Sequence, residues 1–150
     1  SDLILAGRRI NDNMPIFVAQ EIVKILANGK GLRPGARVGV LGISFKENVR
    51  DLHNSRVPEI IEELKSFGVD VIAHDPVVDA DHARHEYGLE LAPRSALKDL
   101  DALVLAVPHE RLLSDMPGLL ASLRPQGLFA DVKSAIDPAT LDRGVQYWSL

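Results

Sequence analysis

Two short runs that are apolar at every position constrain the fold of this chain more than any other feature. They cover residues 38–41 and 102–107. Successive side chains of a β-strand point to opposite faces of the sheet, so a run without polar alternation indicates a strand covered by helices on both faces. Helical and strand patterns alternate along the rest of the chain. Together these features predict an α/β fold with a doubly wound parallel sheet, whose ligands bind at the carboxyl ends of the strands.

The expected elements follow from the change of apolar period along the chain. Strands are expected over residues 37–42, 70–74, 102–107, 128–132 and 145–148, with a short extended piece at 89–91. Helices are expected over 56–67, part of 79–87, 112–123 and 138–143. The first thirty residues have a broad apolar stripe at helical spacing, which would suit contact with both a sheet and a partner subunit. Pro15 leaves two possibilities, a helix that begins near Asn13 or a longer helix that kinks at Pro15.

The bulk properties exclude several classes of protein. The 150 residues suit one compact domain, and the net charge of −4 argues against a general nucleic-acid-binding protein. No apolar run approaches the roughly twenty residues of a membrane span. The chain has no cysteine, which excludes disulfides and thiolate chemistry. We therefore expect a soluble cytoplasmic protein that binds neither nucleic acid nor membrane.

Residues 42–55, between the first predicted strand and the next helix, form a long loop with several cations. The basic side chains in and beside this loop are Lys46, Arg50, His53 and Arg56. Asn54 and Ser55 are residue types that cap helix starts, where free N–H groups point outward. Cations beside such a terminus predict a site for an anion such as phosphate.

The remaining polar positions give weaker signals. Gly39 and Gly42 are three residues apart, so the G-x-G-x-x-G fingerprint of a dinucleotide site is missing. Because Pro76 turns the chain directly after Asp75, we interpret Asp75 as part of a structural turn rather than as a ribose ligand. His109 follows the strand at 102–107 and could contact a ligand or cap the next helix. We expect neither a metal site nor a catalytic pair of side chains.

The loop also carries a longer pattern. It reads Gly39-x-x-Gly42-Ile43-Ser44-Phe45-Lys46-Glu47-Asn48-x-x-Asp51-x-x-Asn54-Ser55, followed by His74-Asp75-Pro76 and Ala106-Val107-x-His109. With this pattern, nearly the whole chain resembles the C-terminal, Rossmann-like UDP-binding domain of the UDP-glucose/GDP-mannose dehydrogenase family. These NAD-dependent nucleotide-sugar 6-dehydrogenases oxidise a UDP-hexose or UDP-N-acetylhexosamine to the uronic acid. The details resemble most closely members that act on UDP-N-acetylhexosamines in the biosynthesis of surface polysaccharides such as capsule.

The resemblance implies roles for particular residues. Phe45 and Lys46 resemble the pair that contacts UDP, and Gly42 lies at the same edge of the sheet. Either Arg8 or Arg9 resembles the arginine of the central helix that reaches the substrate across the dimer interface. Lys133 lies where a basic residue near the substrate is often found.

One position departs from the family pattern. The chain has His53 where the family usually has an arginine associated with the NAD side of the cleft. A histidine has a shorter reach, and its charge changes near neutral pH. We therefore expect a weaker or pH-dependent contact between His53 and NAD phosphate.

The resemblance also implies a division of the chain and a partner. Residues 1–33 correspond to the central dimerisation helix and its linker, and residues 34–150 to the UDP-sugar-binding domain. The NAD domain and the catalytic cysteine are expected outside this chain, which should be a homodimer and inactive alone. A GDP-mannose 6-dehydrogenase and a non-catalytic nucleotide-binding or dimerisation module are the alternatives.

Overall fold

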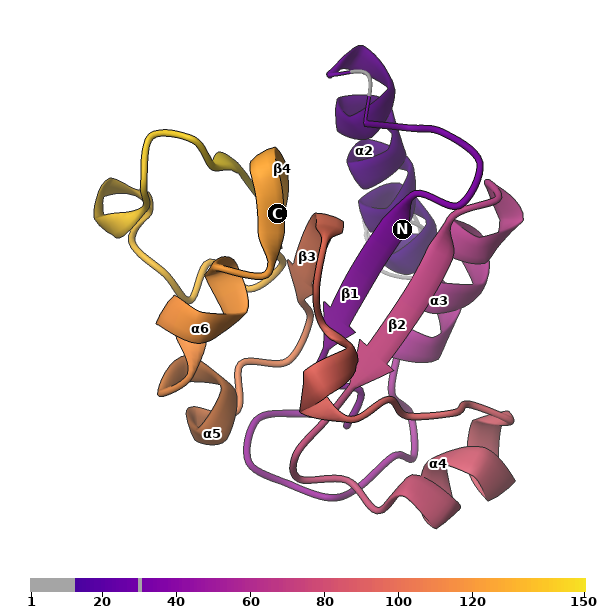
Figure 1. Cartoon of the computed structure of the whole chain (residues 1–150). Coiled ribbons are helices and arrows are strands. Elements are labelled where there is room, and N and C mark those ends of the chain that lie inside the picture. Colours follow the sequence, from indigo (N-terminus) through magenta and orange to yellow (C-terminus); the bar gives the residue numbers. More distant parts are fainter. Residues whose placement is uncertain (1–12, 30) are drawn as a thin grey trace, which may run out of the picture.

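The computed structural model describes residues 13–29 and 31–150, which form one five-stranded sheet (Figure 1). All neighbouring strands are parallel, in the order β2-β1-β3-β4-β5. The strands are β1 (Arg37–Leu41), β2 (Asp70–His74), β3 (Leu100–Leu105), β4 (Leu123–Asp131) and β5 (Gln146–Ser149). The predicted doubly wound parallel sheet is confirmed, and each expected strand is present.

Helices cover both faces of this sheet. On one face α2 (Met14–Asn28) and α3 (Val57–Ser66) pack side by side, and on the other lie α5 (Glu110–Leu113) and α6 (Met116–Leu120). α4 (Ala80–Tyr87) and the long loop after β1 lie at the end of the sheet to which the β1 and β2 arrowheads point in Figure 1. Single 3-10 turns occur at Arg94–Ala96 and Pro138–Thr140.

The two central strands explain why their sequences lack polar alternation. In β3, Ala102 and Val104 belong to the apolar cluster under α2 and α3, whereas Leu103 and Leu105 belong to the cluster under α5 and α6. All four side chains are fully buried. Each face therefore contributes its own core, as a sheet between two helical layers requires.

The helix predicted over residues 112–123 is wrong in its extent, and a proline gives the reason. α5 ends at Leu113, and α6 begins at Met116 with Pro117 in its first turn. Proline has no N–H, and its ring clashes with the carbonyl four residues earlier, so it is accepted only in the first turn of a helix. Pro117 thus divides the predicted helix into two short ones.

Other boundaries also differ from expectation. α2 begins at Met14 with Pro15 in its first turn, which agrees with the first of the two alternatives. The piece at 89–91 forms only one bridge, from Leu91 to Ala73, and the helix predicted over 138–143 is a single 3-10 turn. β4 begins at Leu123, earlier than predicted, because the pairing with β3 shifts register after Leu100.

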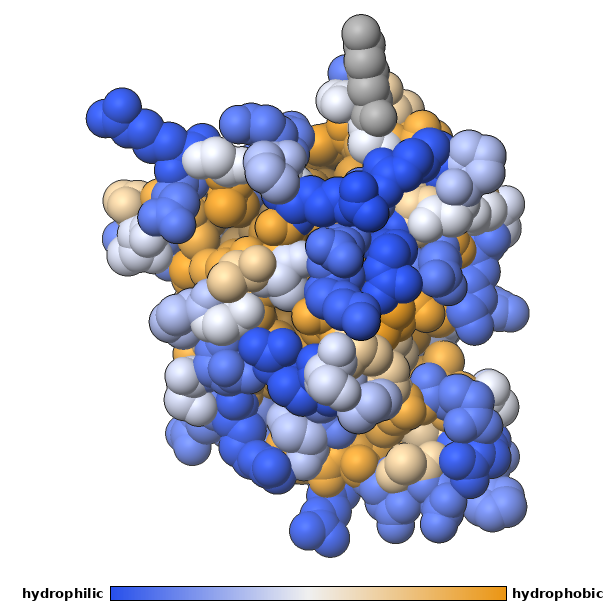
Figure 2. Space-filling view, in the orientation of Figure 1, coloured by the Kyte–Doolittle hydropathy of each residue, from blue (hydrophilic) through white to orange (hydrophobic). Residues whose placement is uncertain are grey.

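One face of the molecule is shown in Figure 2. On the face shown in Figure 2, hydrophilic residues cover most of the area and apolar residues show between them in small patches. Within residues 13–29 and 31–150, no helix is long and apolar enough to cross a membrane.

Candidate functional site at the carboxyl ends of β1 and β3

The strand order places a topological switch point between the carboxyl ends of β1 and β3. The chain leaves β1 toward β2 and leaves β3 toward β4, and ligands of doubly wound sheets bind where the connections diverge in this way. Gly42, which follows β1, has a φ of +83°, and a Cβ there would lie 2.4 Å from the carbonyl oxygen of Val107. A residue without a side chain is therefore needed where the two segments pass each other.

Asp75, at the end of β2, organises the start of the loop. Its Oδ2 accepts hydrogen bonds from the Ile43 N–H at 2.7 Å and from His109 Nε2 at 3.0 Å. Its Oδ1 accepts from the N–H groups of Val77 and Val78 at 2.8 and 3.1 Å. Burial alone would raise the pKa of Asp75, but these hydrogen bonds outweigh it and hold the pKa below its usual value. The prediction that Asp75 belongs to a structural turn is confirmed.

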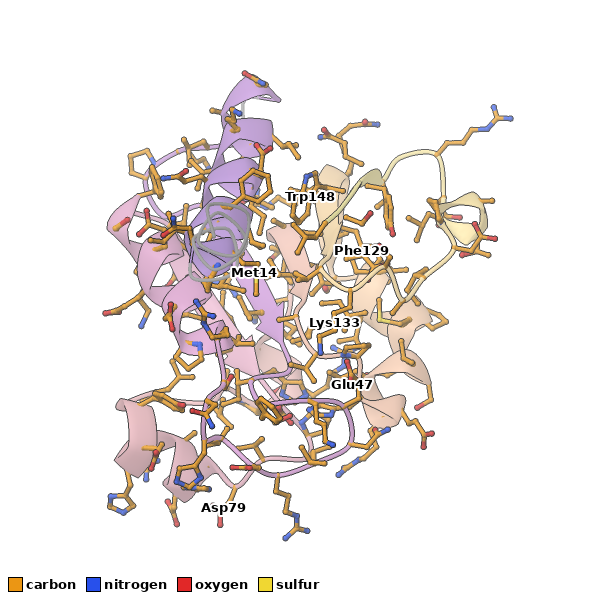
Figure 3. The ribbon with its side chains drawn as sticks, turned by 180° about the vertical axis from the view of Figure 1, so that it is seen from behind. Met14, Glu47, Asp79, Phe129, Lys133 and Trp148 are labelled. Carbon is orange, nitrogen blue, oxygen red and sulfur yellow. The ribbon has the colours of Figure 1, made fainter. Side chains whose placement is uncertain are left out.

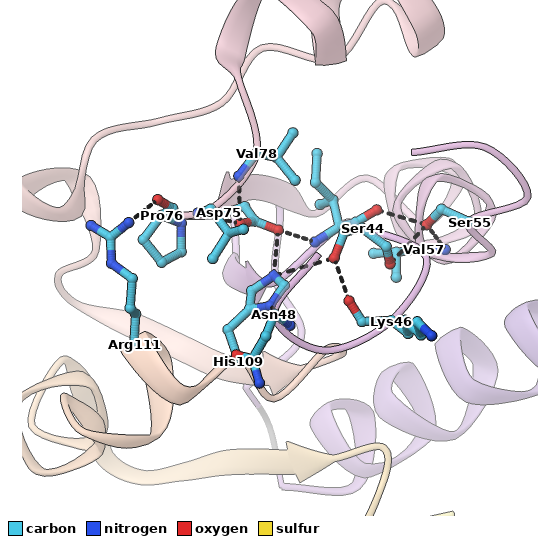
Figure 4. Close-up of polar contacts among 12 residues, drawn as sticks. Ser44, Lys46, Asn48, Ser55, Val57, Asp75, Pro76, Val78, His109 and Arg111 are labelled. Atoms are coloured by element: carbon cyan, nitrogen blue, oxygen red, sulfur yellow. Dashed lines mark hydrogen bonds and ion pairs between the residues drawn. The ribbon is translucent and has the colours of Figure 1, made fainter. Parts of the chain in front are cut away.

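His109 lies at the centre of this network and is completely buried (Figure 4). Its Nδ1 accepts a hydrogen bond from the Asn48 N–H at 2.8 Å, and its Nε2 lies 3.3 Å from Ser44 Oγ. A backbone N–H can only donate, so Nδ1 carries no proton and the neutral ring has its hydrogen on Nε2. His109 is the N-cap residue of α5, one of the two roles considered for it, although its buried side chain makes no capping hydrogen bond.

The residues above this buried histidine form the exposed part of the site. We call residues 44–48 the arch. Ser44 is buried and donates its hydroxyl hydrogen to the carbonyl oxygen of Lys46 at 2.9 Å. Phe45 is 49% exposed, and the Lys46 side chain extends away from His109 in Figure 4. An exposed aromatic ring beside a cation, on a backbone held from below, can contact the ring and the phosphates of a nucleotide.

Lys133, after β4, lies beside Glu47 of the arch (Figure 3). Its Nζ lies 2.7 Å from Oε1 of Glu47. The hydrogen bond from Lys133 is the main reason that the pKa of Glu47 lies below its usual value. Buried Asp131 accepts hydrogen bonds from the N–H groups of Ala135 and Ile136, which holds the turn that presents Lys133. A second cation is thus brought to the arch.

The start of α3, where the sequence predicts an anion site, offers few free N–H groups. Ser55 Oγ accepts from the Val57 N–H at 3.3 Å, and Pro58 has no N–H to offer. Arg56 is the N-cap residue of α3 and donates a hydrogen bond to Glu59, which places a negative charge in the first turn. The helix terminus by itself therefore gives little support to an anion site, which stays a prediction.

His53 and Arg50 lie apart from each other. His53 Nδ1 is 3.0 Å from Asp51 Oδ1, and His53 Nε2 is 3.7 Å from Glu86 of α4. Hydrogen bonds from the backbone and side chain of His53 lower the pKa of Asp51. Arg50 lines a separate hollow of about 320 Å³ with Arg111. His53 therefore belongs to the α4 side of the loop and not to the arch.

The structure thus brings four of the predicted site residues to one edge of the sheet. These are Gly42, Phe45, Lys46 and Lys133. Arg8 and Arg9 lie outside the described residues. The sequence did not reveal that Ser44 and Asn48 contact His109, because 65 and 61 positions separate them along the chain.

Comparison with known proteins identifies one family. Residues 39–138 match the model of the UDP binding domain of the UDP-glucose/GDP-mannose dehydrogenase family. Protein CapL of Staphylococcus aureus is 39% identical over 150 residues, which cover 99% of this chain and 35% of CapL. A UDP-N-acetyl-D-glucosamine 6-dehydrogenase of Pseudomonas aeruginosa is 40% identical over 108 residues, 72% of this chain and 26% of the enzyme.

A solved structure agrees with the fold. The UDP-D-ManNAc dehydrogenase of Pyrococcus horikoshii superposes with a TM-score of 0.78 and 24% identity, over 99% of this chain and 33% of that one. The chain spans about a third or less of the length of the curated relatives and the solved structure named here.

Proposed function

This chain belongs to the UDP-glucose/GDP-mannose dehydrogenase family, and on that premise we propose that it binds the UDP part of a nucleotide sugar for an NAD-dependent 6-dehydrogenase. The observation that carries the proposal is the arch, with Phe45 and Lys46 exposed beyond the carboxyl ends of β1 and β3. Phe45 packs against the base or sugar, and Lys46 pairs with the phosphates. Gly42 lets the loop pass close to Val107 after β3, and Lys133 adds positive charge from the β4 side.

We further propose that the substrate is a UDP-N-acetylhexosamine and that the product serves surface polysaccharide synthesis. The names of the relatives support UDP over GDP, which favours this reading over a GDP-mannose enzyme. Residues 1–33 form the dimerisation helix with its linker, with Arg8 or Arg9 reaching the substrate of the partner in a homodimer. Residues 34–150 form the UDP-sugar-binding domain, and the enzyme is cytoplasmic.

The residues of this chain do not fit NAD as a bound cofactor. The fingerprint glycines are missing, and four N–H groups already occupy the Asp75 carboxylate that would otherwise suit a ribose. NAD is therefore bound mainly by another domain. From its exposed position, His53 adds one contact to NAD. The chain also has no cysteine to form a covalent adduct, so it does not oxidise substrate alone. An unchanged affinity of the parent enzyme for NAD after His53→Arg would contradict the role of His53.

Calorimetric titration with UDP tests the main proposal. Loss of a hydrogen bond to a charged group costs about 1.5–3 kcal/mol, so Lys46→Ala should weaken UDP binding by about tenfold or more. Lys65→Ala is the matched control, because Lys65 is an exposed lysine in the last turn of α3. Equal affinity for UDP of Lys46→Ala and the unchanged chain would refute the proposed site. Tighter binding of GDP than UDP would favour the GDP-mannose alternative, and a stable dimer without nucleotide affinity would favour a dimerisation module.

A further inference from the structure

We propose that His109 is a positioning residue, which holds the arch in the conformation that presents Phe45 and Lys46 to the nucleotide. The inference rests on the proposed function, because it assigns a support to that same site. His109 is completely buried, so it acts through the arch and does not touch the ligand.

The two ends of the arch are attached to the same imidazole ring. Ser44 Oγ lies 3.3 Å from Nε2, and the Asn48 N–H donates to Nδ1 at 2.8 Å. The three residues between them, Phe45, Lys46 and Glu47, therefore span the ring from one nitrogen to the other. A single side chain fixes both ends of the segment that carries the proposed ligand contacts (Figure 4).

Asn48 has a left-handed backbone conformation. Its φ is +63°, a region that asparagine tolerates better than most residues with a side chain. Its N–H donates to His109, and its Oδ1 accepts from the N–H of Glu110 at 2.8 Å. Both partners are at the start of α5, so this short segment stabilises the left-handed backbone conformation two residues from Lys46.

The ring itself is held in one orientation. Its Nε2 donates a hydrogen bond to Asp75 Oδ2, with 3.0 Å between the nitrogen and the oxygen. The same oxygen accepts a hydrogen bond from the Ile43 N–H at 2.7 Å. A ring rotated by 180° about its Cβ–Cγ bond would lose the contacts of both nitrogens. The carboxylate and the imidazole thus connect the ends of β1, β2 and β3, and they transmit this rigid geometry to the arch. A loop that is ordered before binding loses less conformational entropy when the ligand arrives.

Amide side chains separate the contact at Nδ1 from those at Nε2. In His109→Asn, Oδ1 takes the place of Nδ1 and can still accept from Asn48, whereas the reach to Asp75 and Ser44 is lost. In His109→Gln, the terminal amide can still donate to Asp75 and approach Ser44, but the Asn48 N–H has no acceptor. His109→Leu removes all three contacts and keeps similar bulk. His74→Leu is the matched control, because His74 ends β2 but bonds the carbonyl oxygen of Ala92, away from the arch.

The decisive measurement is the UDP dissociation constant of each folded variant, with urea unfolding recorded in parallel. Loss of the Asn48 contact should raise the dissociation constant about tenfold in His109→Leu and His109→Gln. His109→Asn should stay within about threefold of the unchanged chain, and His74→Leu should match it. A UDP affinity of folded His109→Leu within twofold of the unchanged chain would overturn the inference. So would a UDP affinity that is kept in His109→Gln and lost in His109→Asn. A purely structural role would lower stability in all three variants without this order of affinities.

A measurement without ligand separates this inference from the proposed function. The imidazole ¹⁵N spectrum of the unchanged chain should show an unprotonated Nδ1 and a protonated Nε2 on His109. Amide hydrogen exchange at Asn48 should be slow in the unchanged chain and in His109→Asn, and fast in His109→Gln. A protonated Nδ1, or equal exchange in both variants, would overturn the positioning role. Failure of the unchanged chain to bind UDP would instead refute the proposed function, whatever the exchange rates show.

Discussion

Replacing Asp75 by asparagine tests the network beneath the arch while keeping the shape of the side chain. The carboxylate of Asp75 accepts four hydrogen bonds, from Ile43, Val77, Val78 and His109. An asparagine has one oxygen and one NH₂ group, so it can accept on only one side. On the other side, its NH₂ group must face N–H donors.

The structure sets the size of the effect. His109 cannot offer an acceptor to the new NH₂ group, because its Nδ1 already accepts from Asn48. At least two N–H groups therefore lose their acceptor in either orientation of the amide. The loss of one hydrogen bond to a charged group costs about 1.5–3 kcal/mol. Water can reach the half-buried Val77, so the less costly orientation should lower the free energy of unfolding by about 3 kcal/mol in total.

Urea unfolding followed by circular dichroism measures this loss. With a slope of about 1.5–2 kcal/mol/M, the midpoint of Asp75→Asn should fall by about 1.5–2 M. Asp79→Asn is the matched control. Asp79 also accepts a backbone N–H, from Asp81, but it is exposed and caps α4, where asparagine serves equally well. Equal midpoints for Asp75→Asn and Asp79→Asn would refute the reasoning.

Three further predictions concern pH, backbone geometry and charge. The pKa of Asp75 is lowered in the folded state, so its contribution to the free energy of unfolding is complete above the unfolded value of about 3.9 and is lost as pH falls through the folded value. The difference in stability between the unchanged chain and Asp75→Asn should therefore shrink below about pH 4 in urea titrations. A difference that widens would contradict this. Gly42 and Gly68 have nearly equal positive φ, but of the two only Gly42 lies against the segment after β3. Gly42→Ala should therefore lower the free energy of unfolding by roughly 3 kcal/mol, and Gly68→Ala by about 1 kcal/mol. Equal losses would exclude the close contact. Glu47→Gln frees the Lys133 ammonium and should tighten UDP binding about two- to fivefold at low salt by calorimetry, whereas weaker binding would show that the pair supports the site.

Much of the fold could be predicted because local pattern and tertiary structure agree. Apolar runs identified β1 and β3, and apolar residues at helical spacing identified α3. The helix over 112–123 failed where Pro117, a local feature, acted against the apolar pattern. The early start of β4 depends on pairing with β3, which no local pattern contains, whereas the turn at 138–140 is capped locally by Asp137.

The site could be predicted only in part. Phe45 and Lys46 follow the first strand, and the general position of ligands in such sheets leads to them directly. At the start of α3, Pro58 and Glu59 leave few free N–H groups for the anion site expected there. The role of His109 could not be predicted, because its partners come from two other segments, the arch and the end of β2, which meet His109 only in the folded chain.

The most direct test of the central claim is the footprint of UDP on this chain. Two-dimensional ¹H–¹⁵N spectra recorded during a UDP titration report which backbone amides sense the nucleotide. We expect the largest shifts in residues 42–48 and around Lys133, at the carboxyl ends of β1, β3 and β4. Shifts confined to the opposite end of the sheet, or the absence of any shift at millimolar UDP, would contradict a UDP-binding site on the arch.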